Sequence, residues 1–171
     1  MKTSWPCILP QTYKPMIILG IDPGTATTGY ALIKKLKNNS YEILDFGVIT
    51  TRKTMSDAAR LAMLQKDLDV LIRKFKPETA GVEKLYFEKN VKTAMAVSQA
   101  RGVVLLALQK NKVAIQEFTP LQVKSIVCGY GKADKKQVQF MVQKTFGLKH
   151  LPKPDDAADA LGIALCAAVK R

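Results

Sequence analysis

Apolar positions in the early part of the chain fall in runs that are typical of buried β-strands. The segment 16–21 (MIILGI) is continuously apolar, and the segments 28–36 and 41–50 are rich in β-branched and aromatic residues with partial alternation. The polar stretch 37–40 (KNNS) between the last two segments is typical of a hairpin turn. The pattern therefore predicts three strands in succession, joined as a meander.

The pattern then changes to helical spacing. Apolar residues recur every three or four positions over 57–75, and Pro77 ends this predicted helix. Two short strands are predicted at 79–83 and 112–118, with a second helix at 91–110 between them. Strands that alternate with helices indicate crossover connections, so we expect a mixed sheet with helices on its faces.

Two capping motifs predict where further helices begin. TPLQ at 119–122 has Thr at the cap, Pro at the first helical position and Gln at the third, and DKKQ at 134–137 has a similar arrangement. A last, apolar helix is predicted from Asp155 to the end of the chain. The sequence thus predicts an α/β protein with a single domain at 16–171, preceded by a disordered N-terminal extension at 1–15 that carries three prolines.

The charge of the chain favours nucleic acid as its ligand. The sequence has 27 Lys and Arg against 14 Asp and Glu, a formal net charge of +13. Such a surplus favours polyanions, because each neutralised phosphate releases counterions. No uncharged run approaches the roughly 18 residues of a membrane span, and three widely spaced cysteines argue against a disulfide framework or a zinc site. We therefore expect a soluble, cytoplasmic protein that does not bind membranes.

Several acidic residues lie at the ends of these apolar elements. Asp22 ends the first strand, Glu83 ends the fourth, and Asp156 and Asp159 are neighbours on one face of the last helix. Carboxylates clustered in an apolar setting need compensating positive charge. Lys and Arg are one source, but oxygen-rich clusters also select hard divalent cations. Two Mg²⁺ ions, about 3.5–4 Å apart, can clamp an in-line phosphoryl displacement, so these acids are candidate metal ligands.

Local structure offers a simpler explanation for some individual acids. Asp155 fits an N-cap, Asp156 is favoured by the helix dipole in a first turn, and Asp22 fits an Asx-turn. Asp159, flanked by alanines at the end of the first turn, is poorly explained by capping. His150 is the only histidine, so a Ser-His or Cys-His catalytic pair would have to use it.

Five segments occur in an order and spacing that one known family shares. They are ILGIDPGTATTGYALI, GVEKLYFEKN, SQARGVVL, FTPLQVKSIVCGYGKADKKQVQFMV and DDAADALGIAL. Together they resemble the RuvC family of bacterial Holliday junction resolvases from Met16 to Ala168. The resemblance implies an RNase H-like fold, a mixed five-stranded sheet flanked by α-helices, and a homodimer.

The same resemblance implies a reaction and its products. Enzymes of this family nick two strands of like polarity at four-way junction DNA, in homologous recombination and DNA repair. They use water with Mg²⁺ or Mn²⁺ and leave 5'-phosphate and 3'-hydroxyl ends. RuvA and RuvB, which carry out branch migration, are the protein partners that the resemblance implies.

The resemblance also assigns roles to individual residues. The catalytic and metal-binding acids are expected to be Asp22, Glu83, Asp156 and Asp159, with Asp22 bridging two ions. Tyr86 is expected to stack on unpaired bases, at about 1 to 3 kcal/mol per base, whereas Phe87 is expected to be buried. Lys124 and Lys135 match basic positions near the scissile phosphate, and further phosphate contacts are expected from Lys84, Lys89, Lys132 and Lys136. Small residues of the second helix are expected at the dimer contact, namely Ala94, Ala96, Ala100 and Gly102.

Two other functions remain open from the sequence. A related RNase H-like nuclease, acting for example in ribosomal RNA processing, would keep the acids but not the Tyr86–Phe87 loop and the lysine pattern. A non-catalytic junction-binding protein would lack one of the acids, and all of them are present.

Overall fold

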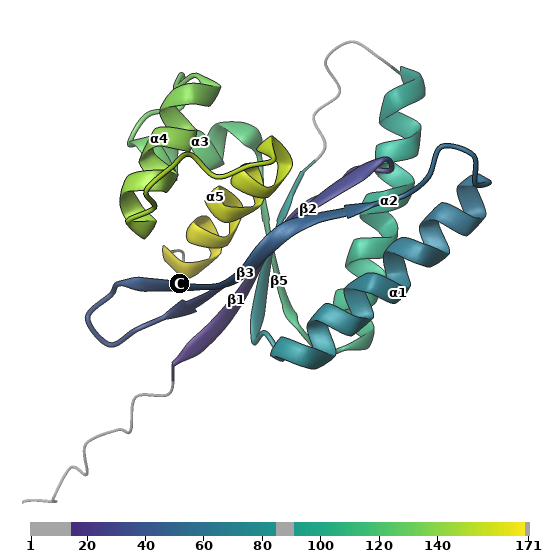
Figure 1. Cartoon of the computed structure of the whole chain (residues 1–171), viewed down its shortest axis with the longest axis horizontal. Coiled ribbons are helices and arrows are strands. Elements are labelled where there is room, and N and C mark those ends of the chain that lie inside the picture. Colours follow the sequence, from purple (N-terminus) through teal and green to yellow (C-terminus); the bar gives the residue numbers. More distant parts are fainter. Residues whose placement is uncertain (1–14, 85–90, 170–171) are drawn as a thin grey trace, which may run out of the picture.

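The computed structural model describes residues 15–84 and 91–169, which form a five-stranded sheet with helices on both faces (Figure 1). The strands are β1 (Met16–Asp22), β2 (Thr27–Lys35), β3 (Tyr41–Thr50), β4 (Thr79–Glu83) and β5 (Ala114–Phe118). They lie in the order β3-β2-β1-β4-β5. β2 pairs antiparallel with both β1 and β3, whereas β4 pairs parallel with both β1 and β5. The predicted mixed sheet is therefore confirmed.

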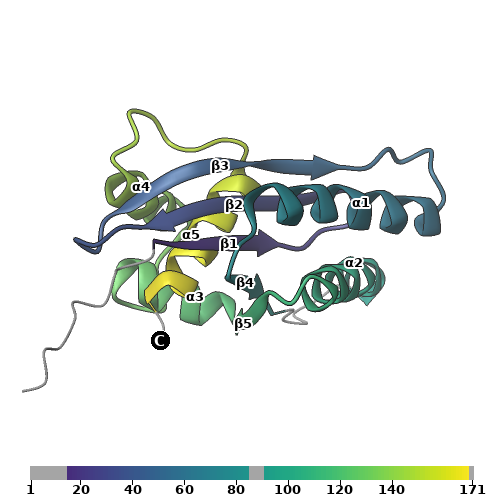
Figure 2. The same cartoon turned by 90° about the horizontal axis from the view of Figure 1, so that it is seen from below.

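The helices lie in two layers on opposite faces of this sheet, as the two views show (Figures 1 and 2). On one face are α1 (Asp57–Phe75) and α2 (Val91–Lys110). On the other are α3 (Pro120–Cys128), α4 (Lys135–Phe146) and α5 (Asp155–Val169). Each layer has its own apolar core against the sheet, so β1 and β4, in the middle of the sheet, are buried from both sides.

Reciprocal capping fixes the starts of α3 and α4. The backbone N–H of Gln122 donates to the Thr119 hydroxyl at 3.2 Å, and the N–H of Thr119 donates to the Gln122 side chain at 2.9 Å. Asp134 and Gln137 form the same pair of bonds, both at 2.8 Å. The two predicted capping motifs are thus confirmed, and each satisfies N–H groups that would otherwise lack a partner.

The apolar helix α5 packs unusually close to the sheet. A Cβ atom built on Gly20 of β1 would lie 2.1 Å from the carbonyl oxygen of Ala160, so only a glycine permits this approach. At the other end of the helix, the Lys35 ammonium donates to the Ala168 carbonyl at 2.9 Å. α5 therefore runs along the sheet, with its first turn at the edge where β1 and β4 end.

Two predictions from the sequence have different outcomes here. Ala100, expected at a dimer contact, is 0% exposed and lies in the core with α1, so that expectation is wrong for this residue. The predicted extension at 1–15 lies, except for its last residue, outside the described residues and stays a prediction. Within residues 15–84 and 91–169, no helix combines the length and apolar character needed to cross a bilayer.

Candidate active site

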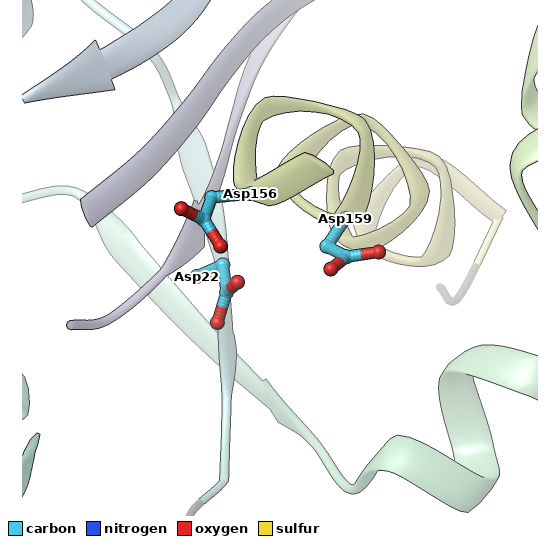
Figure 3. A group of neighbouring side chains, drawn as sticks. All are labelled: Asp22, Asp156 and Asp159. Carbon is cyan, nitrogen blue, oxygen red and sulfur yellow. The ribbon is translucent and has the colours of Figure 1, made fainter. Parts of the chain in front are cut away.

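Three aspartates converge at the edge of the sheet where β1 ends. Asp22 comes from the last position of β1, and Asp156 and Asp159 come from the start of α5 (Figure 3). Each offers a carboxylate oxygen that lies within 4.8 Å of those of the other two. Because the two α5 residues are three apart, they project from the same side of the helix toward β1.

The backbone of β2 sets the position of the first turn of α5. Gly29, which pairs with Asp22 across the β1–β2 ladder, faces the backbone of Asp156. A Cβ atom on Gly29 would lie 2.0 Å from the Asp156 carbonyl oxygen. The glycine therefore allows the helix to bring its acids within reach of the strand acid, a contact that a side chain would prevent.

Glu83 joins this group from the neighbouring strand. β4 runs parallel to β1 with Val82 opposite Ile21, so Glu83 and Asp22 end adjacent strands at the same edge. The two carboxyl groups share a hydrogen bond, and the charge of Asp159 also acts on Glu83. All of the acids predicted from the sequence are thus brought together, and we call Asp22, Glu83, Asp156 and Asp159 the acidic cluster.

Burial and nearby negative charges make Asp22, Glu83 and Asp159 hard to ionise. Burial, followed by the charges of Glu83, Asp159 and Asp156, raises the pKa of Asp22 to about 8. Burial and the charge of Asp159 raise the pKa of Glu83 to about 7, although the hydrogen bond from Asp22 acts in the opposite direction. Burial also raises the pKa of Asp159. The protein folds with several carboxyl groups whose negative charges it compensates only in part.

The composition of this cluster fits a divalent cation. Its donors are carboxylate oxygens, which are the ligands that Mg²⁺ and Mn²⁺ prefer. Their convergence on one space, together with raised pKa values, indicates a site that would be stabilised by added positive charge. These observations agree with the role in binding divalent cations that the sequence predicts for these acids.

Two of the predicted lysines lie at the rim of the acidic cluster. A cavity of about 200 Å³ lies beside it, lined by Glu83, Pro120, Val123, Lys124, Lys135, Val138, Asp159 and Ile163. The Lys135 ammonium lies 3.5 Å from Asp159 and 3.0 Å from Asp155. Lys124 and Lys135 therefore face a space that the acids also border, a suitable position for holding a phosphate group.

Within the part of the chain that the structure describes, the other lysines that were predicted to contact DNA do not line this cavity. Lys84 directly follows β4, Lys132 lies between α3 and α4, and Lys136 lies in the first turn of α4; all three residues are exposed. Tyr86, Phe87 and Lys89 lie outside the described residues, so their predicted roles stay predictions.

Two contacts near the site were not predicted from the sequence. Asp155 is not an N-cap but a member of the first turn of α5, where it pairs with Lys135 and Gln139 of α4. Its spacing of four residues from Asp159 was the available signal, because it places both acids on one face of the helix. Arg101 of α2 pairs with Glu117 and donates to the Glu83 carbonyl at 3.3 Å. No local pattern predicts that second contact, since it joins α2 to the ends of β4 and β5.

Comparisons with known proteins agree with this geometry. Residues 18–167 match the family model described as crossover junction endodeoxyribonuclease RuvC. The enzyme of that name from Fusobacterium nucleatum is 51% identical over 150 residues, which cover 88% of this chain and 78% of the relative. The one from Halothermothrix orenii is 51% identical over 151 residues, covering 88% of this chain and 91% of the relative.

Solved structures support the same conclusion. The structure of Thermus thermophilus RuvC in complex with a Holliday junction substrate has a TM-score of 0.84 and 32% identity, with coverage of 88% of this chain and 92% of that one. A yeast mitochondrial Holliday junction resolvase, at 16% identity and a TM-score of 0.63, shares the fold over 93% of this chain and 82% of its own. The expected RNase H-like fold and crossover junction nuclease function are confirmed. The chain therefore belongs to the RuvC family of crossover junction endodeoxyribonucleases.

Proposed function

We propose that this chain resolves Holliday junctions by hydrolysing phosphodiester bonds at the acidic cluster, with symmetric nicks in two strands of like polarity. The observation that carries the proposal is the convergence of Asp22, Asp156 and Asp159 within 4.8 Å, with Glu83 hydrogen-bonded to Asp22. The T. thermophilus relative, solved with a Holliday junction substrate, supports the choice of substrate. The net charge of +13 suits a DNA ligand.

Two divalent cations, Mg²⁺ or Mn²⁺, are the cofactors of this proposal. The four carboxylates would hold them, and such ions activate an attacking water and stabilise the leaving 3'-oxygen. Asp22 shares a hydrogen bond with Glu83 and offers an oxygen within 4.8 Å of those of Asp156 and Asp159, and the charges of all three acids act on its pKa. This central position supports Asp22 as the ligand that both ions share.

The basic side chains around the cluster would hold the DNA. Lys124 and Lys135 line the cavity that Glu83 and Asp159 also line, so their ammonium groups can contact oxygens of the scissile phosphate. Phosphates farther from the cleavage site would be contacted by four other lysines, namely Lys84, Lys89, Lys132 and Lys136. Tyr86, three residues beyond Glu83 in the sequence, would stack on bases at the opened centre of the junction.

A homodimer would present two such sites to the two-fold symmetric junction. Outward-facing residues of α2 support this assembly: Met95 is 64% exposed, Leu106 is 51% exposed, and Gly102 has open space around it. Their spacing of seven and four places them on one helix face, which two-fold symmetry would pack against its own copy. RuvA and RuvB as partners, and the cytoplasm as compartment, complete the proposal.

Cleavage of a synthetic four-way junction tests the proposal. We expect paired nicks in Mg²⁺ on strands of like polarity, with 5'-phosphate and 3'-hydroxyl ends, and no cutting of a linear duplex of the same sequence. Asp159→Asn should reduce single-turnover cleavage at least about a hundredfold, because it removes a cation ligand and its charge, while the junction stays bound. Asp57→Asn, at an exposed first-turn position of α1, is the matched control and should cleave like the wild type.

Other outcomes would redirect the assignment. Equal cutting of the linear duplex, or preferential cutting of RNA, would favour a related nuclease that acts on other nucleic acid. Tight junction binding without cleavage in either Mg²⁺ or Mn²⁺ would favour a non-catalytic junction-binding protein. Full cleavage activity of the Asp159→Asn variant would mean that the acidic cluster does not carry out the cleavage.

A further inference from the structure

The ammonium group of Lys135 lies between two carboxylates of α5 that differ in their surroundings. Asp155 Oδ2 is 3.0 Å away and Asp159 Oδ2 is 3.5 Å away. Asp159 belongs to the acidic cluster and its side chain is 34% exposed, whereas Asp155 is not part of the cluster and its side chain is 61% exposed. Lys135 thus pairs with one acid inside the cluster and one outside it.

Asp155 is itself held by α4 through both of its oxygens. While Lys135 contacts Oδ2, the side-chain amide of Gln139 donates to Oδ1 at 3.1 Å. Lys135 and Gln139 are four residues apart on α4, so they project from the same face of that helix. The carboxylate is therefore oriented before any substrate arrives, and it gives the flexible lysine side chain a fixed partner.

The two acids are not equivalent once a divalent cation binds. A cation on Asp159 repels Lys135 and competes with it for the same carboxylate. Asp155 stays available, because it lies outside the cluster. We propose that Asp155 is a positioning residue that keeps the Lys135 ammonium at the rim of the acidic cluster when Asp159 binds a cation. This inference rests on the proposed function, in which Lys135 contacts the scissile phosphate.

Loss of the Asp155 charge then has a consequence for cation binding. Without it, Lys135 turns to Asp159 and competes directly with the cation. Asp155→Asn should weaken Mn²⁺ binding by about three- to fivefold, the range expected for an exposed charge pair. Lys135→Met should strengthen Mn²⁺ binding while it slows junction cleavage, because it removes both the competitor and the phosphate contact.

A double-mutant cycle on the DNA-free protein tests whether Asp155 acts through Lys135. Mn²⁺ binding is measured by isothermal titration calorimetry for the wild type, Asp155→Asn, Lys135→Met and the double variant. Asp155→Asn removes the same negative charge whether residue 135 is Lys or Met. A difference between its effects on Mn²⁺ affinity in the two backgrounds therefore measures the part of the effect that depends on Lys135. We expect Asp155→Asn to change Mn²⁺ affinity less than about twofold when Lys135 is Met, and Asp155→Glu to restore much of the affinity. Thermal unfolding of each variant confirms that it is folded.

Each result has a defined meaning. The expected loss of the Asp155→Asn effect in the Lys135→Met background supports the positioning role. An equal effect in both backgrounds, or no effect in either, overturns it, even if the wild type binds Mn²⁺ and cleaves junctions. Failure of the wild type to bind Mn²⁺ overturns the proposed metal site itself, and the inference with it.

Discussion

Asp22 lies where β1 ends, and most of its surroundings make its negative charge unfavourable. Burial and three neighbouring carboxylates raise its pKa from 3.8 to about 8. An isolated buried acid is usually paired with a base, but here the neighbours are acids. A buried carboxylate surrounded by other carboxylates lowers the stability of the fold when no cation is bound, and it is suited to binding one. Such unfavourable groups are common at functional sites.

We predict that the metal-free protein becomes less stable as the pH rises from 6 to 9. The pKa of Asp22 is raised in the folded state, to about 8 from 3.8, and that of Glu83 to about 7 from 4.5. At any pH between the unfolded-state and folded-state pKa values of these two acids, the folded chain binds more protons than the unfolded chain. The stability of the fold is therefore greatest on the acid side of this range and is lost as Asp22 and Glu83 ionise. Thermal unfolding in EDTA over this pH range measures the effect.

The variant Asp22→Asn isolates the contribution of this residue. It should raise the melting temperature at pH 8 to 9 by roughly 3 to 6 °C, since it relieves about 1 to 2 kcal/mol of repulsion. It should also flatten the pH dependence. Asp57→Asn, which alters an exposed acid on α1, should leave both unchanged. A pH dependence as steep in Asp22→Asn as in the wild type would contradict the prediction.

At the scale of elements, the position of α5 decides whether the helix acids meet the strand acid. The helix is buried along nearly its whole length, from Ala157 to Ala168, and contacts β1, β2 and β4. Its close approach depends on glycines in the strands beneath it. An apolar helix thus serves as the rigid support of an acidic site, since its packing leaves little freedom to shift.

We predict that Gly20→Ala destabilises the protein and weakens its cation site together. The new Cβ atom would lie 2.1 Å from the Ala160 carbonyl oxygen and 2.5 Å from the Ala164 nitrogen, both backbone atoms of α5. Relieving this overlap by moving the helix should cost about 3 kcal/mol, as urea unfolding would measure. The same movement separates Asp156 and Asp159 from Asp22, so calorimetry should show Mn²⁺ binding reduced by about tenfold or more, on the order of 1.4 kcal/mol.

Gly162→Ala is the matched control on α5 itself. Its new Cβ atom would meet Val123, Val142 and Val127 at 3.7 to 3.8 Å, which is ordinary contact. Alanine is favoured over glycine inside a helix by about 1 kcal/mol, so this variant should be as stable as the wild type or more stable. If Gly20→Ala behaved in the same way, the argument from close packing would be wrong.

At the scale of the whole molecule, the two helix layers present different surfaces. The α3–α5 layer carries the cluster and its lysines. Exposed apolar side chains lie on both layers, among them Leu121 on α3, Phe140 on α4, and Met95 and Leu106 on α2. The chain has a net charge of +13, although its site is acidic. DNA would therefore be attracted by the chain as a whole, and cations by the acidic cluster in particular.

We predict that Leu106→Asp converts the proposed dimer to monomers. The charge would lie on the α2 face that the proposed two-fold dimer packs against its own copy, where its burial is unfavourable. Sedimentation velocity should show dimer dissociation at a concentration at least tenfold lower than needed for the wild type, an effect of about 1.4 kcal/mol or more. Stability of the monomer should hardly change, because Leu106 is 51% exposed.

Val70→Asp provides the comparison. Val70 is an apolar residue on α1 with similar exposure, 58%, but it lies on another helix. Its variant should sediment like the wild type. Dimers that persist in Leu106→Asp, or that dissociate equally in Val70→Asp, would place the interface elsewhere.

The sequence by itself determined much of this protein. The spacing of apolar residues predicted the ends of the strands and helices to within a few residues. The capping motifs at Thr119 and Asp134 predicted where two of the helices begin. These signals are local, since each depends on neighbours along the chain. The acids could be chosen as well, because a carboxylate at the end of an apolar strand or helix is conspicuous when the surrounding residues favour burial.

Only the tertiary structure decided how those elements meet. Gly20 and Gly29 are ordinary strand residues in the sequence, but they allow α5 to touch β1 and β2 and so bring the acids within 4.8 Å. Ala100 has the small side chain of a contact residue but faces the core, and Asp155 resembles a cap but pairs with α4. Contacts between elements depend on which faces pack together, and that is set by long-range burial that no short stretch of sequence records.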